Sequence, residues 1–379
     1  MVPVRLIPIN CVKENSFLGK TIYDAEGRAL LHKGTRITNG LIKRIKNIGI
    51  QAIYIIDEYS SNEIEDIIKP EVRMKAIKVI KDTFEYLEQY SVDKGKINLN
   101  GAHRKRSIIY RDKYIDSLMD VSKLIVDEVL LNKDVLINLV DIKSMDNYTY
   151  EHSVNVAVLS LVIGVEQGLS IKELHDLCVG ALLHDVGKAF IPNEILKKPY
   201  ELTEDEFELM KQHPVKGYEY IKSNISLSAV TKVIVLEHHE RMDGGGYPRN
   251  LDRSKIHSAT RIVTVADVYD ALTSHRPYRT AILPNEAIEL IMGSAGRHFD
   301  FKIAYSFVRK VVPYPVGTVV KLSNGYCGVV EDIPVNYPLR PRLRLIRSNL
   351  GETLSETIDL LKEKNIVITG VQFEVPEQV

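Results

Sequence analysis

Seven residues of the types that bind divalent metals lie between positions 152 and 267. Five are histidines and two are aspartates, and imidazole and carboxylate groups are the ligands expected of Fe, Mn, Zn and similar cations. Each residue alone has an ordinary alternative role as a hydrogen-bonded polar side chain, but that role becomes implausible for the whole set. The sequence therefore predicts a metal centre built from His152, His184, Asp185, His213, His238, His239 and Asp267.

Two adjacent pairs in this set follow apolar stretches with helical spacing. His184 and Asp185 follow residues 171–183, and His238 and His239 follow residues 230–236. Successive side chains on a helix point about 100° apart. Asp185 can therefore reach a different metal from His184, or bridge two metals. Two neighbouring histidines at a buried helix end are costly unless they form hydrogen bonds or bind a metal.

The remaining ligands also belong to helical stretches. We expect His152 to face inward with the apolar residues 154–165 that follow it, and Asp267, at the end of the apolar stretch 262–267, to need a cation. Gly187 is expected to stop the helix before it. The helix that carries His213 is expected to end there, because Pro214 follows.

Two loops near these residues carry groups suited to an anion. Residues 243–248 read DGGGYP, and glycines let backbone amides approach a phosphate or a flat base closely, with Tyr247 able to stack or donate. Residues 276–279 read RPYR, in which Arg276 and Arg279 suit a phosphate or a guanine edge. The alternatives are a flexible loop and a surface loop.

These residues resemble the HD-GYP family, a branch of the HD metal-dependent phosphohydrolases. The resemblance covers residues 148–300 through several motifs in order. They are YTYEHS around His152, HDVGK at 184–188, QHPVKG around His213, HHERMDGGGYP at 238–248 and VADVYDALTSHRPYR at 265–279. The segment after YPVGTVVKL also looks like one often found behind such domains.

The resemblance implies hydrolysis of cyclic di-GMP to linear pGpG and then to GMP. It assigns the seven residues above as metal ligands, with Asp185 in the bridging and catalytic position and Lys188 as the lysine beside the metals. It also implies substrate contacts from Gly246, Tyr247, Asp270, Arg276 and Arg279.

The family's pattern is not matched at one position. Some members have a carboxylate four residues before the first histidine and hold a third metal, whereas this chain has Tyr148 there. We therefore expect two metals. Asp146 and Glu151 are near in sequence but have the wrong spacing for that third site.

The chemistry of such a centre agrees with the resemblance. Two divalent cations about 3.5–4 Å apart can hold a bridging water as hydroxide, because metal binding lowers the pKa of water to about 7. This hydroxide would attack phosphorus in line with the leaving 3′ oxygen. Lys188 is assigned to phosphate stabilisation or to the leaving group. The donor set fits Fe or Mn best, and Zn and Ni remain open.

The expected fold is mainly α. A small mixed α/β module at residues 1–70, with no ligand site that can be identified, precedes a helical linker at 71–143. The HD-type helical catalytic domain follows at 144–312, and a small β module closes the chain at 313–379. Residues 93–107 are polar, contain two glycines and are expected to form a loop.

Composition limits the partners. The 379 residues include 50 Lys and Arg and 50 Asp and Glu, so the formal net charge is zero. This argues against a DNA or RNA polymer or a membrane surface as a partner. No apolar stretch of about 20 residues predicts a membrane span, and the first residues lack a signal peptide's features. Three cysteines suit a reducing cytoplasm. A homodimer is left open.

Three other functions compete with this interpretation. A related HD enzyme could act on other nucleotides or on another cyclic dinucleotide, such as cyclic GMP-AMP. The HD residues alone permit this, whereas the GYP and RPYR segments favour cyclic dinucleotides. A nucleotide-sensing module without turnover should have lost ligands, and this chain retains them. A purely structural scaffold does not explain the clustered histidines.

Overall fold

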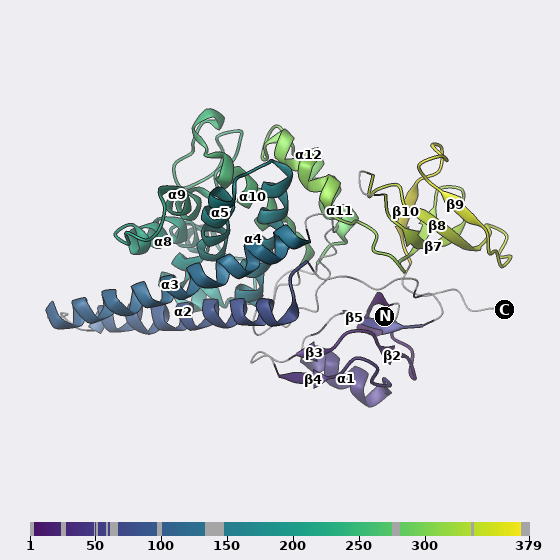
Figure 1. Ribbon diagram of the computed structural model, residues 1–379, viewed down its shortest axis with the longest axis horizontal. Coiled ribbons are helices and arrows are strands. Elements are labelled where there is room, and N and C mark those ends of the chain that lie inside the picture. The colour runs from purple at the N-terminus through teal and green to yellow at the C-terminus, as the bar shows by residue number, and fades with distance from the viewer. Residues whose placement is uncertain are drawn as a thin grey trace.

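The computed structural model describes residues 4–23, 28–48, 50, 52–57, 60, 67–96, 101–132, 148–274, 281–334 and 337–372, without the side chains of residues 6, 89–96, 101–108 and 148. Its elements form a large helical body, a small N-terminal α/β group and a C-terminal β group (Figure 1). The mainly α fold with strands at both ends is therefore confirmed.

The N-terminal group combines short antiparallel strands with one helix. Its bounds are β1 Arg5–Pro8, η1 Ile9–Cys11, β2 Phe17–Leu18, β3 Ile22–Tyr23, β4 Ala29–Leu31, α1 Asn39–Asn47 and β5 Ala52–Ile56. The three-stranded sheet has the order β1-β5-β2, and β3 pairs with β4. Thr38 caps α1, since its hydroxyl accepts from the amide of Leu41. Isoleucines such as Ile7, Ile45 and Ile53 form a core of their own.

A helical hairpin leads from this group to the body. Helix α2 spans Pro70–Lys96 and α3 spans Gly101–Leu131. The prediction of a loop is wrong for residues 93–96 and 101–107, which are helical, and residues 97–100 lie outside the described residues. Lys and Arg have high helix propensity, so a polar stretch that contains them is compatible with helix. Figure 1 shows the hairpin running along one edge of the body and past it.

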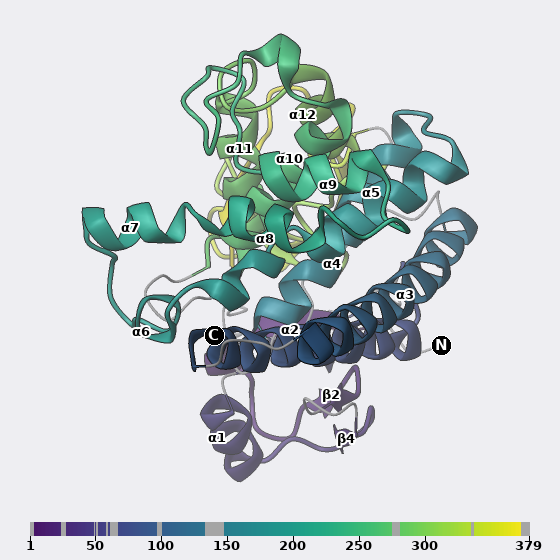
Figure 2. The same ribbon diagram turned by 90° about the vertical axis from the view of Figure 1, so that its left-hand side faces the viewer.

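Helix α4 lies at the centre of the body and is apolar on nearly all sides. It packs against α2, α3, α5, α10 and α12, and residues 152–164 are buried without interruption. Figure 2 shows α4 between the hairpin and α10, with α6 and α7 extending to one side. Each fully buried Val or Leu of such a helix contributes about 1.5–3 kcal/mol to stability.

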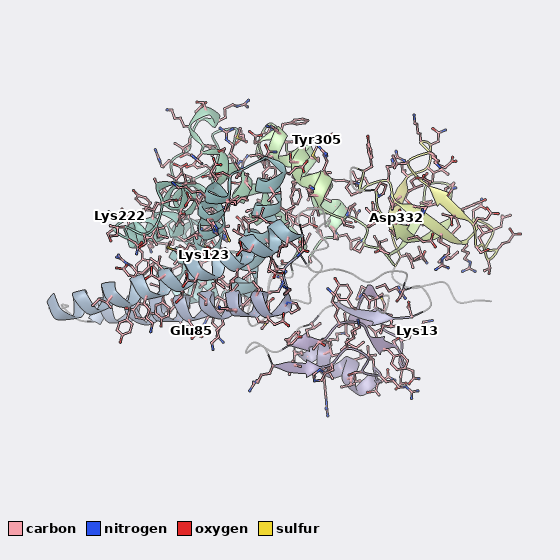
Figure 3. The ribbon with its side chains drawn as sticks, in the orientation of Figure 1. Lys13, Glu85, Lys123, Lys222, Tyr305 and Asp332 are labelled. Atoms are coloured by element: carbon pink, nitrogen blue, oxygen red, sulfur yellow. The ribbon has the colours of Figure 1, made fainter. Side chains whose placement is uncertain are left out.

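The bounds of the body's elements after the hairpin are α4 Tyr148–Glu166, α5 Ile171–Leu183, η2 Val186–Phe190, α6 Asn193–Leu196, α7 Glu204–Met210, α8 His213–Ile221, α9 Ala229–Glu237, η3 Arg253–Lys255, α10 Ser258–Thr273, α11 Pro284–Gly293 and α12 Phe301–Lys310. Lysines such as Lys123 and Lys222 point outward from its surface (Figure 3).

The C-terminal group is one antiparallel sheet with the order β10-β6-β7-β8-β9. Its strands are β6 Val319–Leu322, β7 Cys327–Asp332, β8 Arg342–Arg347, β9 Thr357–Asp359 and β10 Ile368–Val371. Gly325 has a φ of +83° in the turn between β6 and β7, a conformation that glycine adopts without strain. A separate small core includes Val320 and Leu322 of β6, Val330 of β7, and Leu343 and Leu345 of β8.

Among the described residues, no helix combines the length and the apolar character that crossing a bilayer would require.

Candidate metal centre

Five elements of the body bring the predicted ligands together. His152 lies in the second turn of α4, and Asp267 lies in α10. The other ligands lie at helix ends: His184 and Asp185 follow α5, His213 begins α8, and His238 and His239 follow α9. Six of the seven residues are buried, and His239 is partly exposed. Helix ends from separate parts of the chain therefore meet around one buried polar site.

Helix α5 places His184 and Asp185 through well-defined ends. At its start, Ser170 and Glu173 form a capping box. The helix ends at Leu183, and η2 follows Asp185. Gly187 has a different role from the one expected, because a Cβ on it would lie 1.9 Å from the carbonyl oxygen of His213. The glycine is needed for close backbone packing of η2 against α8 rather than for a helix stop.

Pro214 also has a different role from the one expected. It occupies the first turn of α8, and α7 has already ended at Met210. A proline is well tolerated in the first turn, because its missing amide hydrogen would have no partner within the helix there. His213 therefore opens a helix, and its side chain is buried at that end.

Three histidines are oriented by carbonyl groups of their own helical turns. Nδ1 of His184 donates to the carbonyl of Ala181 at 2.7 Å. Nδ1 of His213 donates to Met210 at 2.8 Å, and Nδ1 of His238 donates to Val235 at 3.1 Å. With the proton on Nδ1, each Nε2 presents a lone pair to the interior of the site, which is the form that binds metals.

The two oxygens of Asp185 face different pairs of histidines. Oδ1 lies 3.3 Å from Nε2 of His213 and 3.8 Å from Nε2 of His238. Oδ2 lies 3.3 Å from Nε2 of His184 and 3.9 Å from Nε2 of His152. Asp185 is thus common to two groups of ligand atoms, one with His152 and His184 and the other with His213, His238 and His239.

Asp267 makes a second connection between the groups. Its Oδ1 lies 3.1 Å from Nε2 of His152, and its Oδ2 lies 3.9 Å from Nδ1 of His239. A pair of cations, each held by histidines and sharing carboxylates, is the arrangement that this geometry supports.

Electrostatics keep three of the ligands, Asp185, His238 and His239, in metal-binding forms. Burial would raise the pKa of Asp185, but Lys188 and the imidazole of His184 outweigh it and hold that pKa well below its usual value. Burial together with the neighbouring histidines lowers the pKa of His238 far below the ordinary range and that of His239 to about 3. The carboxylate is therefore ionised and these two imidazoles are neutral at pH 7.

Without a cation, several ligand atoms of this site lack a favourable partner. Nε2 of His213 and Nε2 of His238 lie 3.1 Å apart, and since each ring donates from Nδ1, two lone pairs face each other. Among the described residues, Nε2 of His184 and Oδ1 of Asp185 are buried without a hydrogen bond. Such groups are costly to bury unless a proton or a cation satisfies them.

Comparison with known proteins agrees with this geometry. Residues 134–303 match the HD domain, and residues 319–374 match the KOW domain associated with HD domain. A cyclic di-GMP phosphodiesterase of Pseudomonas aeruginosa is 37% identical over 246 residues, which are 63% of this chain and 59% of that protein. A cyclic di-GMP phosphodiesterase of Thermotoga maritima is 34% identical over 225 residues, 56% of this chain and 61% of that protein.

The chain therefore carries a segment of the HD-domain family, at residues 134–303. Another relative, the 3′3′-cGAMP-specific phosphodiesterase 1 of Vibrio cholerae, is 37% identical over 169 residues, 45% of this chain and 38% of that protein. The chain spans less than two thirds of the length of each of these curated relatives.

The GYP loop, Gly246–Tyr247–Pro248, packs on the predicted metal site. The rings of Tyr247 and His239 have centroids 4.6 Å apart and planes inclined by 31°. A Cβ on Gly246 would lie 2.4 Å from the amide nitrogen of Arg241, so this glycine allows the loop to fold back on the residues after His239. In this structure the glycine's role is close packing, and the tyrosine supports a predicted ligand.

The other residues predicted to contact substrate are placed as follows. Lys188 is partly exposed beside the site, and its Nζ lies 2.5 Å from Oδ2 of Asp185. Asp270 is buried, and its Oδ2 accepts from Nδ1 of His152 at 2.8 Å. This contact places Asp270 behind a predicted ligand. Arg276 and Arg279 lie outside the described residues, as does Asp146.

Asn155 is a residue of the site that the sequence analysis does not identify. Asn155 is buried in α4, and its Nδ2 donates to Oδ1 of Asp270 at 3.0 Å. Its signal was a polar amide three residues after His152, within an otherwise apolar helix. Such an amide is expected to have buried hydrogen-bond partners.

Proposed function

We propose that this chain is a metal-dependent phosphodiesterase that hydrolyses cyclic di-GMP to linear pGpG and then to GMP. The observation that carries the proposal is the position of Asp185, whose two oxygens face two separate groups of histidines. The names of the relatives from Pseudomonas and Thermotoga support the choice of substrate.

The residues divide into two ligand sets in this proposal. One cation would be held by His152, His184, Asp185 and Asp267. The other would be held by His213, His238 and His239 together with the same two carboxylates. When bound, two divalent cations, Fe or Mn in our proposal, supply a water nucleophile at neutral pH and neutralise charge on the phosphate.

The other residues of the site bind and orient the substrate in this proposal. The ammonium of Lys188 is partly exposed beside Asp185 and can stabilise the charge that develops on the phosphate or on the leaving 3′ oxygen. The ring of Tyr247 holds His239 in place from one face and offers its edge to a base. Arg276 and Arg279 are proposed to bind the phosphate or guanine.

A substrate panel with product chromatography tests the activity. Protein purified without oxygen and loaded with Fe(II) or Mn(II) should convert cyclic di-GMP to pGpG, with GMP appearing later. Asp185→Asn should abolish turnover and metal binding, whereas Asp120→Asn, a change at an exposed surface residue, should leave both intact. An unaltered rate in Asp185→Asn would contradict the proposal.

Cyclic GMP-AMP is a second candidate substrate. It is favoured by the 37% identity to the Vibrio enzyme named for that nucleotide. In the same panel, a kcat/KM for cyclic GMP-AMP at least tenfold above that for cyclic di-GMP would assign the chain to that substrate. Similar values would indicate a site that accepts both.

Three broader expectations also stand as proposals. We propose a cytoplasmic location, because the chain has only three cysteines and no CxxC motif. We propose no nucleic-acid polymer or membrane as a partner. We also propose the domain division 1–70, 71–143, 144–312 and 313–379, in which the helical linker packs on the catalytic domain. A homodimer is left to measurement of the mass in solution.

A further inference from the structure

A line of hydrogen bonds connects helix α2 to His152. Nη1 of Arg73, in the first turns of α2, donates to Oδ1 of Asn155 at 2.6 Å. Nδ2 of Asn155 donates to Oδ1 of Asp270 at 3.0 Å, and Oδ2 of Asp270 accepts from Nδ1 of His152 at 2.8 Å. The line crosses from α2 to α4, to α10 and back to α4.

His152 differs from other ligands in what holds its ring. His184, His213 and His238 each donate to a carbonyl three residues earlier, so their orientation is set within one turn of chain. His152 donates instead to Asp270, which is 118 residues away in sequence. Its orientation therefore depends on how α4 and α10 pack and on which rotamer Asp270 adopts.

The amide of Asn155 can be oriented in only one favourable way between its neighbours. Its oxygen faces the guanidinium of Arg73, and its amide nitrogen faces the carboxylate of Asp270. A flip of the amide would set donor against donor at one end and acceptor against acceptor at the other. Arg73 therefore fixes Asn155, and Asn155 in turn fixes the carboxylate that orients His152.

Burial makes this arrangement stiff. Asn155 and Asp270 are each 1% exposed, and His152 is 2% exposed. Water has little access to replace a lost partner, so removing one member of the line leaves a buried polar group poorly satisfied. The effect of a change at Arg73 should reach His152 through this line.

We propose that Arg73 is a positioning residue for the metal ligand His152, acting through Asn155 and Asp270. Arg73 lies outside residues 134–303, which match the HD domain, so α2 contributes to the support of the metal centre. This inference rests on the proposed metal centre. It also gives α2, which leads from the N-terminal group into the body, a direct polar connection to a ligand.

The test measures metal binding by the full-length chain. Metal-free protein is titrated with Co(II), and the visible absorption bands of the bound ion report its ligands. Arg73→Met should weaken binding of one of the two equivalents about tenfold, the lower end of the range for changes to partners of metal-bound histidines. Its absorption bands should also change. Arg73→Lys, which restores a cationic donor, should recover most of the affinity.

Lys69→Met is the matched control. Lys69 precedes α2 by one residue and forms an ion pair at 2.8 Å with Glu128 of α3. Its loss removes a polar contact between the two helices of the hairpin without touching the line to His152. Co(II) affinity and spectrum should remain those of the unchanged chain.

The outcomes separate the two proposals. If the unchanged chain binds no Co(II), the metal centre itself is wrong. If it binds two equivalents and Arg73→Met behaves like Lys69→Met, only the role of Arg73 is wrong. Should Arg73→Met fail to fold, Arg73→Gln serves as the charge-removing variant. Asn155→Leu and the double variant Asn155→Leu/Arg73→Met should weaken Co(II) binding equally, because Arg73 acts through Asn155. If the double variant loses the sum of the two single effects, Arg73 does not act through Asn155.

Discussion

Nζ of Lys188 lies 2.5 Å from Oδ2 of Asp185, the same oxygen that faces Nε2 of His184. One carboxylate oxygen thus meets a predicted metal ligand and a cationic side chain. The ammonium lowers the pKa of this buried carboxyl group and lies near enough to the proposed centre to meet a phosphate.

Replacement of Lys188 by Met should separate catalysis from metal binding. We expect kcat for cyclic di-GMP to fall about 10²-fold, the loss typical of removing one preorganised electrostatic group, while two metals remain bound. Parallel kinetics and elemental analysis check this. Lys222→Met, at a surface lysine of α8's end that is visible in Figure 3, is the control. Equal loss of metal and activity would show that Lys188 acts on the metal site instead.

Metal binding should stabilise the folded chain. The facing lone pairs of His213 and His238, 3.1 Å apart, are unfavourable until a cation lies between the donors. At a free metal concentration 100 times the Kd, one site should add about 2.7 kcal/mol to the free energy of unfolding. Thermal unfolding with Mn(II) and with a chelator measures the difference. Asp185→Asn should abolish the shift, and its persistence in that variant would place the cation elsewhere.

The ring and the hydroxyl of Tyr247 should have separable effects. Tyr247→Phe keeps the ring against His239 and should retain the metal content, with any change confined to KM. Tyr247→Ala removes the aromatic contact, which is worth about 0.5–1.5 kcal/mol, and should weaken metal binding several-fold. Metal titration of both variants is the measurement. A Phe variant that loses metal as readily as the Ala variant would contradict the stacking role.

Arg276 should act on the substrate and not on the metals. A charged hydrogen bond is worth about 1.5–3 kcal/mol, so Arg276→Ala should raise the Kd for cyclic di-GMP by about tenfold or more. Metal content should not change. Arg44→Ala, at an exposed arginine of α1, controls for loss of surface charge. The affinities are measured by calorimetric titration of cyclic di-GMP into metal-loaded protein that also carries Lys188→Met, which slows hydrolysis during the titration. An unchanged Kd would show that Arg276 does not contact the substrate.

The metal-free protein should lose stability in mild acid. The pKa of His239 is lowered from its ordinary value to about 3, mainly by burial and by His213, and that of His238 is lowered as well. Between pH 6.5 and 3 the unfolded chain therefore binds more protons than the folded one, so stability falls as the pH falls. The slope is about 1.4 kcal/mol per pH unit for each such histidine.

His152 works in the opposite direction. Hydrogen bonds to Asp267 and Asp270 outweigh burial and raise the pKa of His152, so its contribution is present in acid and is lost as the pH rises through its folded-state pKa. The thermal unfolding midpoint of chelator-treated protein, measured at pH 7 and at pH 5, shows which effect is larger. We expect the higher midpoint at pH 7. His239→Gln should reduce the difference. A higher midpoint at pH 5 would refute the expectation.

Local features of the sequence determined the ligand types and much of their setting. Histidine–aspartate and histidine–histidine pairs after apolar helical stretches identified the site, because such groups are costly at a buried helix end unless they bind a cation or form hydrogen bonds. The carbonyl groups that orient His184 and His213 lie three residues earlier, so that geometry is also local.

Tertiary packing decided the rest, because it depends on contacts between distant segments. The role of Gly187 follows from η2 approaching the carbonyl of His213, which no pattern around position 187 contains. Pro214 is compatible by its sequence with the end of one helix and with the start of the next, and only the structure shows that it opens α8. Arg73 and Asn155 are 82 positions apart in the sequence, and Asn155 and Asp270 are 115 apart. They meet only because α2, α4 and α10 pack together.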